Sequence, residues 1–331
     1  LGILPLPAQF FNNKYCNSPL RYAIIFKIFI RGILSMNIYD IKKDLESKST
    51  KNIILDTDTY NEVDDQFALA YAAIHPQINL LSICAAPFMN ERVANPKQGM
   101  EKSFDEIHNI LALMNLSGKF PIYKGSEQFL NGQRTPLDSP AARNIIQTAQ
   151  SAQELIYVVA IGAITNVASA LLLAPEIKEK IAVLWLGGNS LIKDGIEFNL
   201  AQDVTAAQTV LESGVPFIHL PALGVVSNLL TTIPELEYYL SGKNRLCDYL
   251  VDIVRQYPSD PYAYSKPIWD VAAVALMTTP EGFDRVILPK PILTPDCRYA
   301  FDAGREPMIY VRALNRDKIF AELFRLLSKQ N

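Results

Sequence analysis

The sequence predicts an α/β fold, in which a single domain has a central, mostly parallel sheet flanked by helices. From about residue 52 to the C-terminus, short apolar segments alternate with helical patterns, which is typical of strand–helix–strand units. Two of the apolar segments, residues 157–161 and 182–186, have no polar face, as expected for strands that helices cover on both sides. No repeat or low-complexity linker divides the 331 residues, so we expect one large domain.

The individual elements follow from the same patterns. The expected strands are the apolar runs at residues 53–56, 78–85, 155–161, 181–186 and 215–220. The expected helices cover residues 64–75, 97–116, 140–151, 165–174, 203–213, 243–256, 267–278 and 315–329. The segment 257–267 is rich in proline and tyrosine, which predicts a loop. This loop either only connects its neighbours or forms a lid or a stacking wall over a planar ligand.

The first fifty residues differ from the rest of the chain. Residues 20–34 are apolar but are interrupted by Arg21, Lys27 and Arg31, so they are too short and too charged for a membrane span. They also lack the layout of a signal peptide. We expect residues 1–50 to be an N-terminal extension, either disordered or a gene-start artefact with Met36 as the true start, and the domain to cover residues 51–331. A helix on a membrane surface is the alternative for this extension.

Composition argues against several classes of function. The net charge is −3 and no long run carries one sign, which argues against nucleic-acid and membrane partners. The cysteines are scattered without metal-ligand spacing, which favours reduced thiols in a cytoplasmic protein: Cys16, Cys84, Cys247 and Cys297. The three histidines, His75, His108 and His219, are equally isolated, so a histidine-ligated metal is not expected.

A cluster of acids is the strongest functional pattern in the chain. Five acids follow the apolar run at residues 53–55 and precede a helical pattern: Asp56, Asp58, Glu62, Asp64 and Asp65. In an open parallel sheet, the carboxyl ends of the strands are where ligands bind. Carboxylates so close together repel one another unless a cation offsets their charge, and oxygen ligands suit calcium or magnesium.

Simpler interpretations of this cluster remain open at this point. Asp64 or Asp65 could cap the helix, and Asp56 and Asp58 could be solvated turn residues. An EF-hand loop does not fit, because its sixth and twelfth positions would hold Asn61 and Phe67 in place of glycine and glutamate.

Further polar clusters follow later strands at the same predicted edge. They are the segments 162–167, 187–189 and 197–203, and Trp269 with Asp270 at the start of an apolar helix. Helix caps at Thr165, Asn166 or Asp203 are the alternative interpretation of the first and third segments. The glycines at 187–188 let the backbone approach a ligand closely. Asp270 is flanked by apolar residues, so its carboxylate needs a partner, and a metal is one.

Together these residues resemble the inosine-uridine nucleoside hydrolase family. The family has an Asp-x-Asp…Asp-Asp run after its first strand, and here this run is Asp56, Asp58, Asp64 and Asp65. The later family motifs match residues 161–166, 187–189, 197–199 and 269–270 in the same order. The resemblance extends from about residue 52 to the C-terminus, and it implies the family's Rossmann-like fold.

The resemblance also implies an activity, which is hydrolysis of the N-glycosidic bond of ribonucleosides to a free base and ribose. Calcium would be held by Asp58, Asp65, Asp270 and the backbone carbonyl of Ile161, or that of Ala160 if the alignment slips by one residue. Asp58 would act as the general base on a metal-activated water. The predicted substrate contacts are Asp64, Asn189, Glu197, Phe198, Asn199 and Trp269, with Asp56 supporting the loop from behind. The family further suggests a homodimer or a homotetramer.

Three departures from the family pattern concern the pocket. Five residues separate Asp58 from Asp64, where the family has three, so the two extra residues could bulge outward or shift Asp64. Trp269 stands where many members have a histidine that protonates the leaving base, and an indole cannot act as a general acid. Trp269 could instead stack on a purine, together with Tyr262 and Tyr264. Residues 86–90 lack the family's base-facing asparagine after the second strand.

Two other functions are compatible with parts of the sequence. A haloacid-dehalogenase-like, magnesium-dependent phosphatase also has an Asp-x-Asp pair after its first strand, but the segment 197–199 would then be unexplained. A catalytically weak nucleoside- or ribose-binding protein on the same fold is the non-enzymatic alternative, because fold does not determine function.

Overall fold

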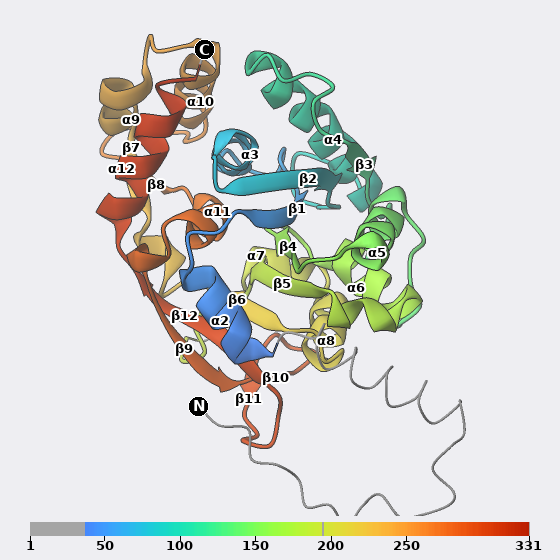
Figure 1. Cartoon of the computed structure of the whole chain (residues 1–331). Helices are drawn as coiled ribbons and strands as arrows, with labels where there is room; N and C mark the ends of the chain where they lie inside the picture. The colour runs from blue at the N-terminus through green and yellow to red at the C-terminus, as the bar shows by residue number, and fades with distance from the viewer. Residues whose placement is uncertain (1–36, 194, 331) are drawn as a thin grey trace, which may run out of the picture. The chain divides into compact units, whose positions relative to one another are not determined.

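An eight-stranded sheet runs through the middle of the folded unit in the order β3-β2-β1-β4-β5-β6-β12-β9 (Figure 1). The computed structural model of the protein describes residues 37–193 and 195–330, so most of the expected extension lies outside the described residues. The strands are β1 (Lys51–Thr57), β2 (Ile78–Ala85), β3 (Ile122–Lys124), β4 (Ile156–Ala160), β5 (Ile181–Leu186), β6 (Phe217–Leu220), β9 (Phe283–Pro289) and β12 (Pro307–Leu314). All neighbours are parallel except β12 and β9, which confirms the predicted mostly parallel α/β fold.

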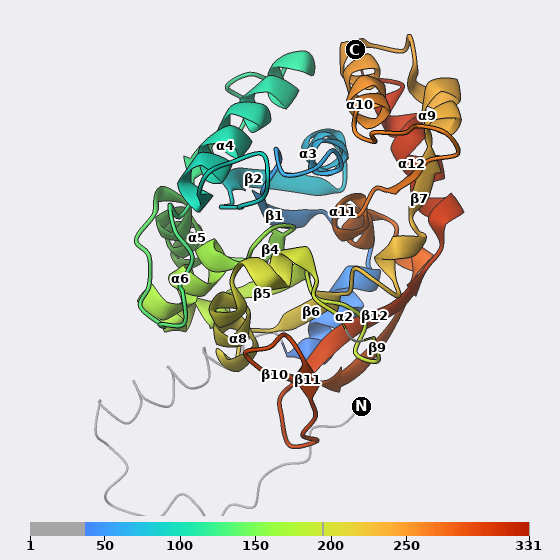
Figure 2. The ribbon, with the colours of Figure 1, turned by 180° about the vertical axis from the view of Figure 1, so that it is seen from behind.

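Helices flank the sheet (Figure 1). They are α2 (Ile38–Glu46), α3 (Asp65–Ile74), α4 (Pro96–Leu113), α5 (Pro140–Ser151), α6 (Thr165–Leu173), α7 (Phe198–Gln202), α8 (Val204–Glu212), α9 (Ile233–Leu240), α10 (Arg245–Gln256), α11 (Val271–Thr278) and α12 (Arg316–Leu327). Both ribbon views show α9, α10 and α12 gathered around the C-terminus, away from α5, α6 and α8 (Figures 1 and 2). In the described part of the chain, no helix combines the length and the apolar character that a membrane crossing requires.

The centre of the sheet forms the core. Every residue of β4 and β5 is buried, which explains why these segments contain no polar alternation. The indole of Trp185 in β5 is 2% exposed, and its Nε1 donates a hydrogen bond to the carbonyl of Gly162 at 3.0 Å. The loop after β4 is therefore fixed from the neighbouring strand.

The strand order contains a change of direction between β1 and β4. The chain builds β1, β2 and β3 outward on one side and then returns to place β4 on the other side of β1. At such a switch point the loops after the two central strands diverge and leave a crevice at their carboxyl ends. Here those loops begin at Asp58 and Ile161, and the amide of Ile161 is hydrogen-bonded to the carbonyl of Asp56 at 2.8 Å.

Two small sheets lie beside the main one. β7 (Leu230–Thr232) pairs with β8 (Ser265–Pro267), and β10 (Ile292–Leu293) pairs with β11 (Tyr299–Ala300), both antiparallel. The segment 265–267 was expected to form a loop running into a helix from residue 267. Instead, α11 begins at Val271, because the preceding residues pair with β7. This pairing positions the chain that leads into Trp269 and Asp270.

The folded unit begins earlier than residue 51. Asn37 caps α2 by accepting hydrogen bonds from the amides of Tyr39 and Asp40. Three residues of α2, Ile38, Ile41 and Leu45, are buried, so this helix contributes an apolar face to the core. This helix lies inside the segment 1–50 that we expected to be an extension, and the apolar spacing at 38, 41 and 45 could have revealed it.

Candidate active site

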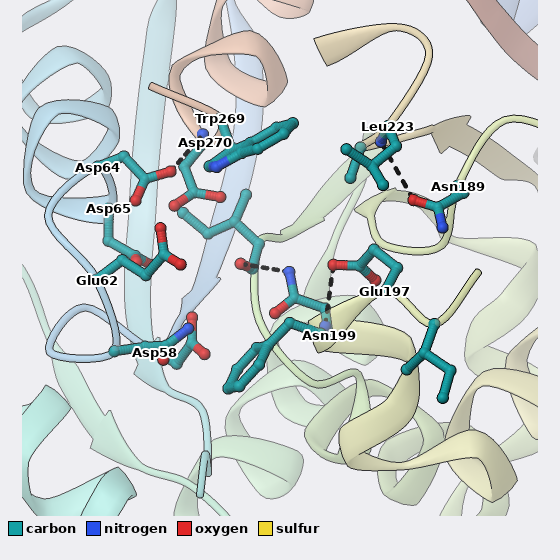
Figure 3. Close-up of a pocket in the computed structure, with 15 residues that line it drawn as sticks. Asp58, Glu62, Asp64, Asp65, Asn189, Glu197, Asn199, Leu223, Trp269 and Asp270 are labelled. Atoms are coloured by element: carbon teal, nitrogen blue, oxygen red, sulfur yellow. Dashed lines mark hydrogen bonds between the residues drawn. The ribbon is translucent and has the colours of Figure 1, made fainter. Parts of the chain in front are cut away.

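A pocket lies at the switch point, on the carboxyl side of β1 and β4. Asp58, Asn61, Glu62, Asp64 and Asp65 line it from the β1–α3 turn, and Ile161 lines it from the end of β4. The opposite side is formed by Asn189, Ile196, Glu197, Phe198 and Asn199, and Ala222, Leu223, Trp269 and Asp270 complete it. Figure 3 shows the acids of the β1–α3 turn facing Asn189, Glu197 and Asn199 across this pocket. The predicted clusters therefore meet in one place, although they come from distant parts of the sequence.

Three of the acids already have oxygen atoms close together. Asp64, Asp65 and Asp270 each place one carboxylate oxygen within 4.8 Å of the others, and each residue is at most 4% exposed. Asp64 and Asp270 occupy the N-cap positions of α3 and α11, while Asp65 is the first residue of α3. The partial positive charge of two helix N-termini therefore offsets some of the repulsion between these carboxylates.

These acids do not serve as helix caps. The side chains of Asp64 and Asp270 make no capping hydrogen bond to their own helices. Asp65 accepts a hydrogen bond of 2.5 Å from the hydroxyl of Thr57, and Asp64 accepts one of 3.4 Å from the amide of Asp270. Because capping does not explain these carboxylates, the simpler interpretation of the acid run does not hold for them.

Asp58 is one of the buried acids that line the pocket. It is 1% exposed, and its Oδ2 has no hydrogen-bond partner among the described residues. Its carboxylate packs against Gly162, where an added Cβ would approach Oδ1 to 2.8 Å. Only glycine therefore fits at position 162 without displacing Asp58. A buried oxygen without a partner is costly unless a ligand or an ion supplies one.

Burial makes the ionised form of the cluster unfavourable. Burial first, and then the charge of Asp65, raise the pKa of Asp58 well above its usual value. Burial, followed by the charge of Asp64, raises the pKa of Asp270 well above its usual value, and the same two causes raise the pKa of Asp65 to about 7. The pKa of Asp64 is also raised by burial, although Lys266 opposes this. A bound cation would favour the ionised forms of all four groups.

The residues present fit a hard metal ion. The cluster offers carboxylate oxygens, which are preferred ligands of calcium and magnesium. Asp58 lines the same pocket and has a buried oxygen without a partner among the described residues. The carbonyl of Ile161 also lines the pocket, where it accepts a hydrogen bond of 3.1 Å from the Nδ2 of Asn199. A carbonyl oxygen has two lone pairs, so this bond leaves one free.

The polar residues opposite the acids are held by the backbone. Glu197 caps α7, and its two oxygens accept hydrogen bonds from the amides of Gly188, Asn199 and Leu200 at 2.6–3.0 Å. Asn199 donates through Nδ2 to the carbonyls of Ile161 and Leu186, which leaves its Oδ1 without a donor among the described residues. Asn189 donates to the carbonyl of Gly195 and accepts from the amide of Leu223.

Aromatic residues border the pocket at Trp269 and Phe198. Trp269 is partly buried, and Phe198 is 36% exposed. Tyr262 is 89% exposed and does not line the pocket, and neither does Tyr264. Of the stacking wall that we expected from Trp269, Tyr262 and Tyr264, only Trp269 borders the pocket, and the two tyrosines belong to the turn before β8. Phe198 is the second aromatic ring at the pocket.

Asp56 lies behind the pocket and does not line it. It is fully buried, and its Oδ1 accepts a hydrogen bond of 2.8 Å from the Nδ2 of Asn166. Asn166 in turn accepts bonds from the amide and hydroxyl of Ser126, so it connects β1, α6 and the loop after β3, and it does not cap α6. Asp203 caps α8, as one interpretation of the sequence predicted.

Three residues near the acids were not given roles from the sequence. Asn61 and Glu62 line the pocket from within the lengthened turn. Lys266, which is 4% exposed, forms salt bridges with Glu62 and with Asp64, the second at 3.9 Å. The run of five residues between Asp58 and Asp64 was the signal for the first two. The position of Lys266 depends on the pairing of β8 with β7, which the sequence pattern does not predict.

The fold and the site together define an α/β enzyme with an acid-lined, metal-compatible pocket at the sheet's switch point. The sequence pattern of the inosine-uridine preferring nucleoside hydrolase family matches residues 53–300. The chain belongs to this family, and it is a hydrolase that acts on N-glycosyl compounds. This membership excludes the phosphatase alternative.

Known relatives agree with this assignment. The non-specific ribonucleoside hydrolase RihC of Salmonella paratyphi A is 29% identical over 259 residues, which cover 70% of this chain and 80% of that protein. The pyrimidine-specific ribonucleoside hydrolase RihB of Escherichia coli is 25% identical over 262 residues, with the same coverage of both proteins. Among solved structures, a plant nucleoside hydrolase has a TM-score of 0.68 at 18% identity, covering 84% of this chain and 99% of that chain, which shows a common fold.

Proposed function

We propose that the protein hydrolyses the N-glycosidic bond of ribonucleosides in a calcium-dependent reaction, with Asp58 as the general base. The observation that carries this proposal is the meeting of Asp58 with Asp64, Asp65 and Asp270 in one buried pocket, opposite Glu197 and Asn199. The pocket has a volume of about 180 Å³. This is smaller than the roughly 300–1,000 Å³ of sites that enclose drug-sized ligands. We therefore infer that the cavity encloses the sugar and leaves the base nearer to the surface.

We propose that Asp58, Asp65, Asp270 and the Ile161 carbonyl hold the calcium ion. This set follows the family resemblance. Asp64 also has an oxygen within 4.8 Å of those of Asp65 and Asp270, and we assign it to the sugar. Asp58 is preferred as a ligand because it has a buried oxygen without a partner among the described residues. Bound calcium would offset the negative charge of the cluster and make water in its coordination shell easier to deprotonate.

The proposed roles of the side chains are proton transfer and binding of the sugar. Asp58 accepts the proton of the attacking water, because its carboxylate lies in the pocket and bound calcium would favour its ionised form. Asp64, Asn189, Glu197 and Asn199 hold the ribose hydroxyls, and the free Oδ1 of Asn199 supplies one acceptor. Fixed hydrogen bonds to the sugar favour a distorted, oxocarbenium-like sugar if they strengthen as the glycosidic bond breaks.

Among the described residues that line this pocket, no histidine is present to protonate the leaving base. Trp269 cannot protonate the base, but its ring can stack on a purine, and Phe198 offers a second apolar surface. We therefore propose that stacking on Trp269 helps the base to leave. The proposed homodimer or homotetramer rests on the family resemblance alone.

A reducing-sugar assay tests the proposed function. Purified full-length protein would be incubated with inosine, adenosine, guanosine, uridine and cytidine, with calcium and again after chelation. We expect ribose release that stops on chelation and returns when calcium, but not potassium, is added back. Binding of these nucleosides without any ribose release would support the alternative of a binding protein and would refute the proposal.

A further inference from the structure

The turn between Asp58 and Asp64 is held in place from two sides. Residues 59–63 exceed the family's usual spacing by two residues, yet Asp64 and Asp65 still reach the start of α3 beside Asp270. This turn does not bulge away from the pocket, because Asn61 and Glu62 line it. Something must therefore hold this longer turn against the pocket.

One side of the turn is braced by the loop after β2. Arg92 donates from Nη1 to the carbonyls of Tyr60 and Asn61 at 2.9 and 3.1 Å, and its guanidinium lies 4.2 Å above the Tyr60 ring. Asn90 donates to the Oδ1 of Asn61 at 2.8 Å. The amide of Asn61 closes the turn by donating to the carbonyl of Asp58 at 2.7 Å.

The other side is held by a buried lysine. The ammonium group of Lys266 contacts the carboxylate of Glu62 and lies 5.0 Å from the centre of the Tyr257 ring. Lys266 is 4% exposed, whereas the Glu62 side chain is 35% exposed. The pair connects the β1–α3 turn to β8, which lies just before Trp269 and Asp270, across 204 positions of sequence.

We propose that Glu62 and Lys266 are a pair of positioning residues that fixes the lengthened turn and thereby sets where Asp64 meets the sugar. This inference rests on the proposed function, because it assigns the pair to the sugar-binding step of that reaction. Lys266 does not line the pocket, so it acts on the substrate through the turn and through Asp64, whose carboxylate lies 3.9 Å from its ammonium group. The bridge also joins the two segments that carry Asp65 and Asp270, so both sides of the acid cluster depend on it.

Charge variants separate positioning from a simple electrostatic effect. Lys266→Met makes the region more negative, whereas Glu62→Gln makes it less negative, and the double variant keeps the original net charge. If the pair acts by position, all three variants raise KM for a ribonucleoside by about tenfold, because small displacements of a substrate-holding group have effects of this size or larger. The losses are also non-additive, since each single change already breaks the same bridge.

Lys290→Met provides a matched control. Lys290 is 2% exposed, pairs with Glu306 at 3.3 Å and donates to the carbonyl of Val215, so it resembles Lys266 in burial and pairing but belongs to the β9 end of the sheet. We expect this variant to lose stability and to keep the KM of the wild type. KM changes of opposite sign in the two single variants, additive losses, or an equal rise in KM for Lys290→Met would overturn the proposal.

Hydrogen exchange tests the pair without any turnover. Breaking the bridge should speed exchange of the amides at residues 59–65 by about tenfold or more in the Lys266→Met and Glu62→Gln variants, but not in Lys290→Met. Unchanged exchange in this turn would refute the positioning role, even if the enzyme turns over nucleosides. Faster exchange in a protein whose wild type releases no ribose would show that the bridge holds the turn, and that the proposed function itself is wrong.

Discussion

Asp56→Asn should make the calcium-free protein respond differently to pH. Asp56 is fully buried, and its Oδ2 has no partner among the described residues. Burial raises its pKa from 3.8 to about 7, although the hydrogen bond from Asn166 opposes this rise. A buried acid whose pKa is raised by folding does not lower the free energy of unfolding at a pH below its unfolded pKa, but it lowers that free energy increasingly at higher pH. Asp56 therefore destabilises the fold as pH rises from about 4 to about 7.

The size of this effect follows from the difference between the two pKa values. A folded pKa of about 7 against an ordinary 3.8 corresponds to roughly 4 kcal/mol of unfavourable free energy at neutral pH. At about pH 5 the same difference costs only roughly 1.5 kcal/mol, because the folded protein then keeps its proton on Asp56. The asparagine carries no such cost, but its amide nitrogen lacks an acceptor, which costs about 1–3 kcal/mol at every pH.

Measuring the stability difference between variant and wild type at two pH values separates the effect of the carboxylate from that constant cost. We expect the free energy of unfolding of Asp56→Asn, relative to the wild type, to improve by up to about 2.5 kcal/mol between about pH 5 and about pH 8. Urea unfolding of both proteins in the presence of a chelator would measure it. A relative stability that stays constant across this range would show that Asp56 is ionised in the fold at a normal pKa, and the argument from burial would be wrong.

The remaining predictions concern the pocket. Asp58→Ala should lower kcat by about 10²–10⁴-fold with an unchanged circular dichroism spectrum, and wild-type rates would remove it from the mechanism. Asp270→Ala should lose bound calcium on dialysis, which metal analysis would detect; unchanged metal content would exclude it as a ligand. Trp269→Ala should lower kcat/KM more for purine than for pyrimidine nucleosides, and equal losses would contradict stacking. Gly162→Ala should lower kcat by about 10²-fold, because its Cβ would displace Asp58; full activity would show that Asp58 adapts.

The sequence predicted the centre of the fold better than its edges. The central strands β1, β2, β4, β5 and β6 lie where apolar runs predicted them, because both of their faces are covered. The strands β3, β9 and β12 were missed. β3 has only three residues, and several residues of β9 are partly exposed, so neither forms a long apolar run. The apolar segment 308–311 of β12 was a visible signal that was overlooked.

The site could be predicted as a set of segments but not as a set of contacts. Parallel strands carry their carboxyl ends to one edge, so the acids after β1 and the polar residues after β4 and β5 had to lie near one another. The contacts within the site depend in addition on the residues at which the helices begin. Asp64 and Asp270 are N-cap residues whose side chains do not cap their helices, because α3 and α11 start immediately after them. One residue of difference in either start would have turned a carboxylate away from the pocket.

The lengthened turn shows why a motif can survive a change in spacing. Asp58 is fixed by the end of β1 and by its contact with Gly162, whereas Asp64 and Asp65 are fixed by the start of α3. The strand and the helix set the positions of these acids, so the connecting turn needs only to span the gap. Two extra residues can be accommodated there if the turn is anchored, and Arg92 and Lys266 provide anchors on its two sides. Asn61 and Glu62 belong to this longer turn and line the pocket, so the departure from the family pattern falls on the pocket wall itself.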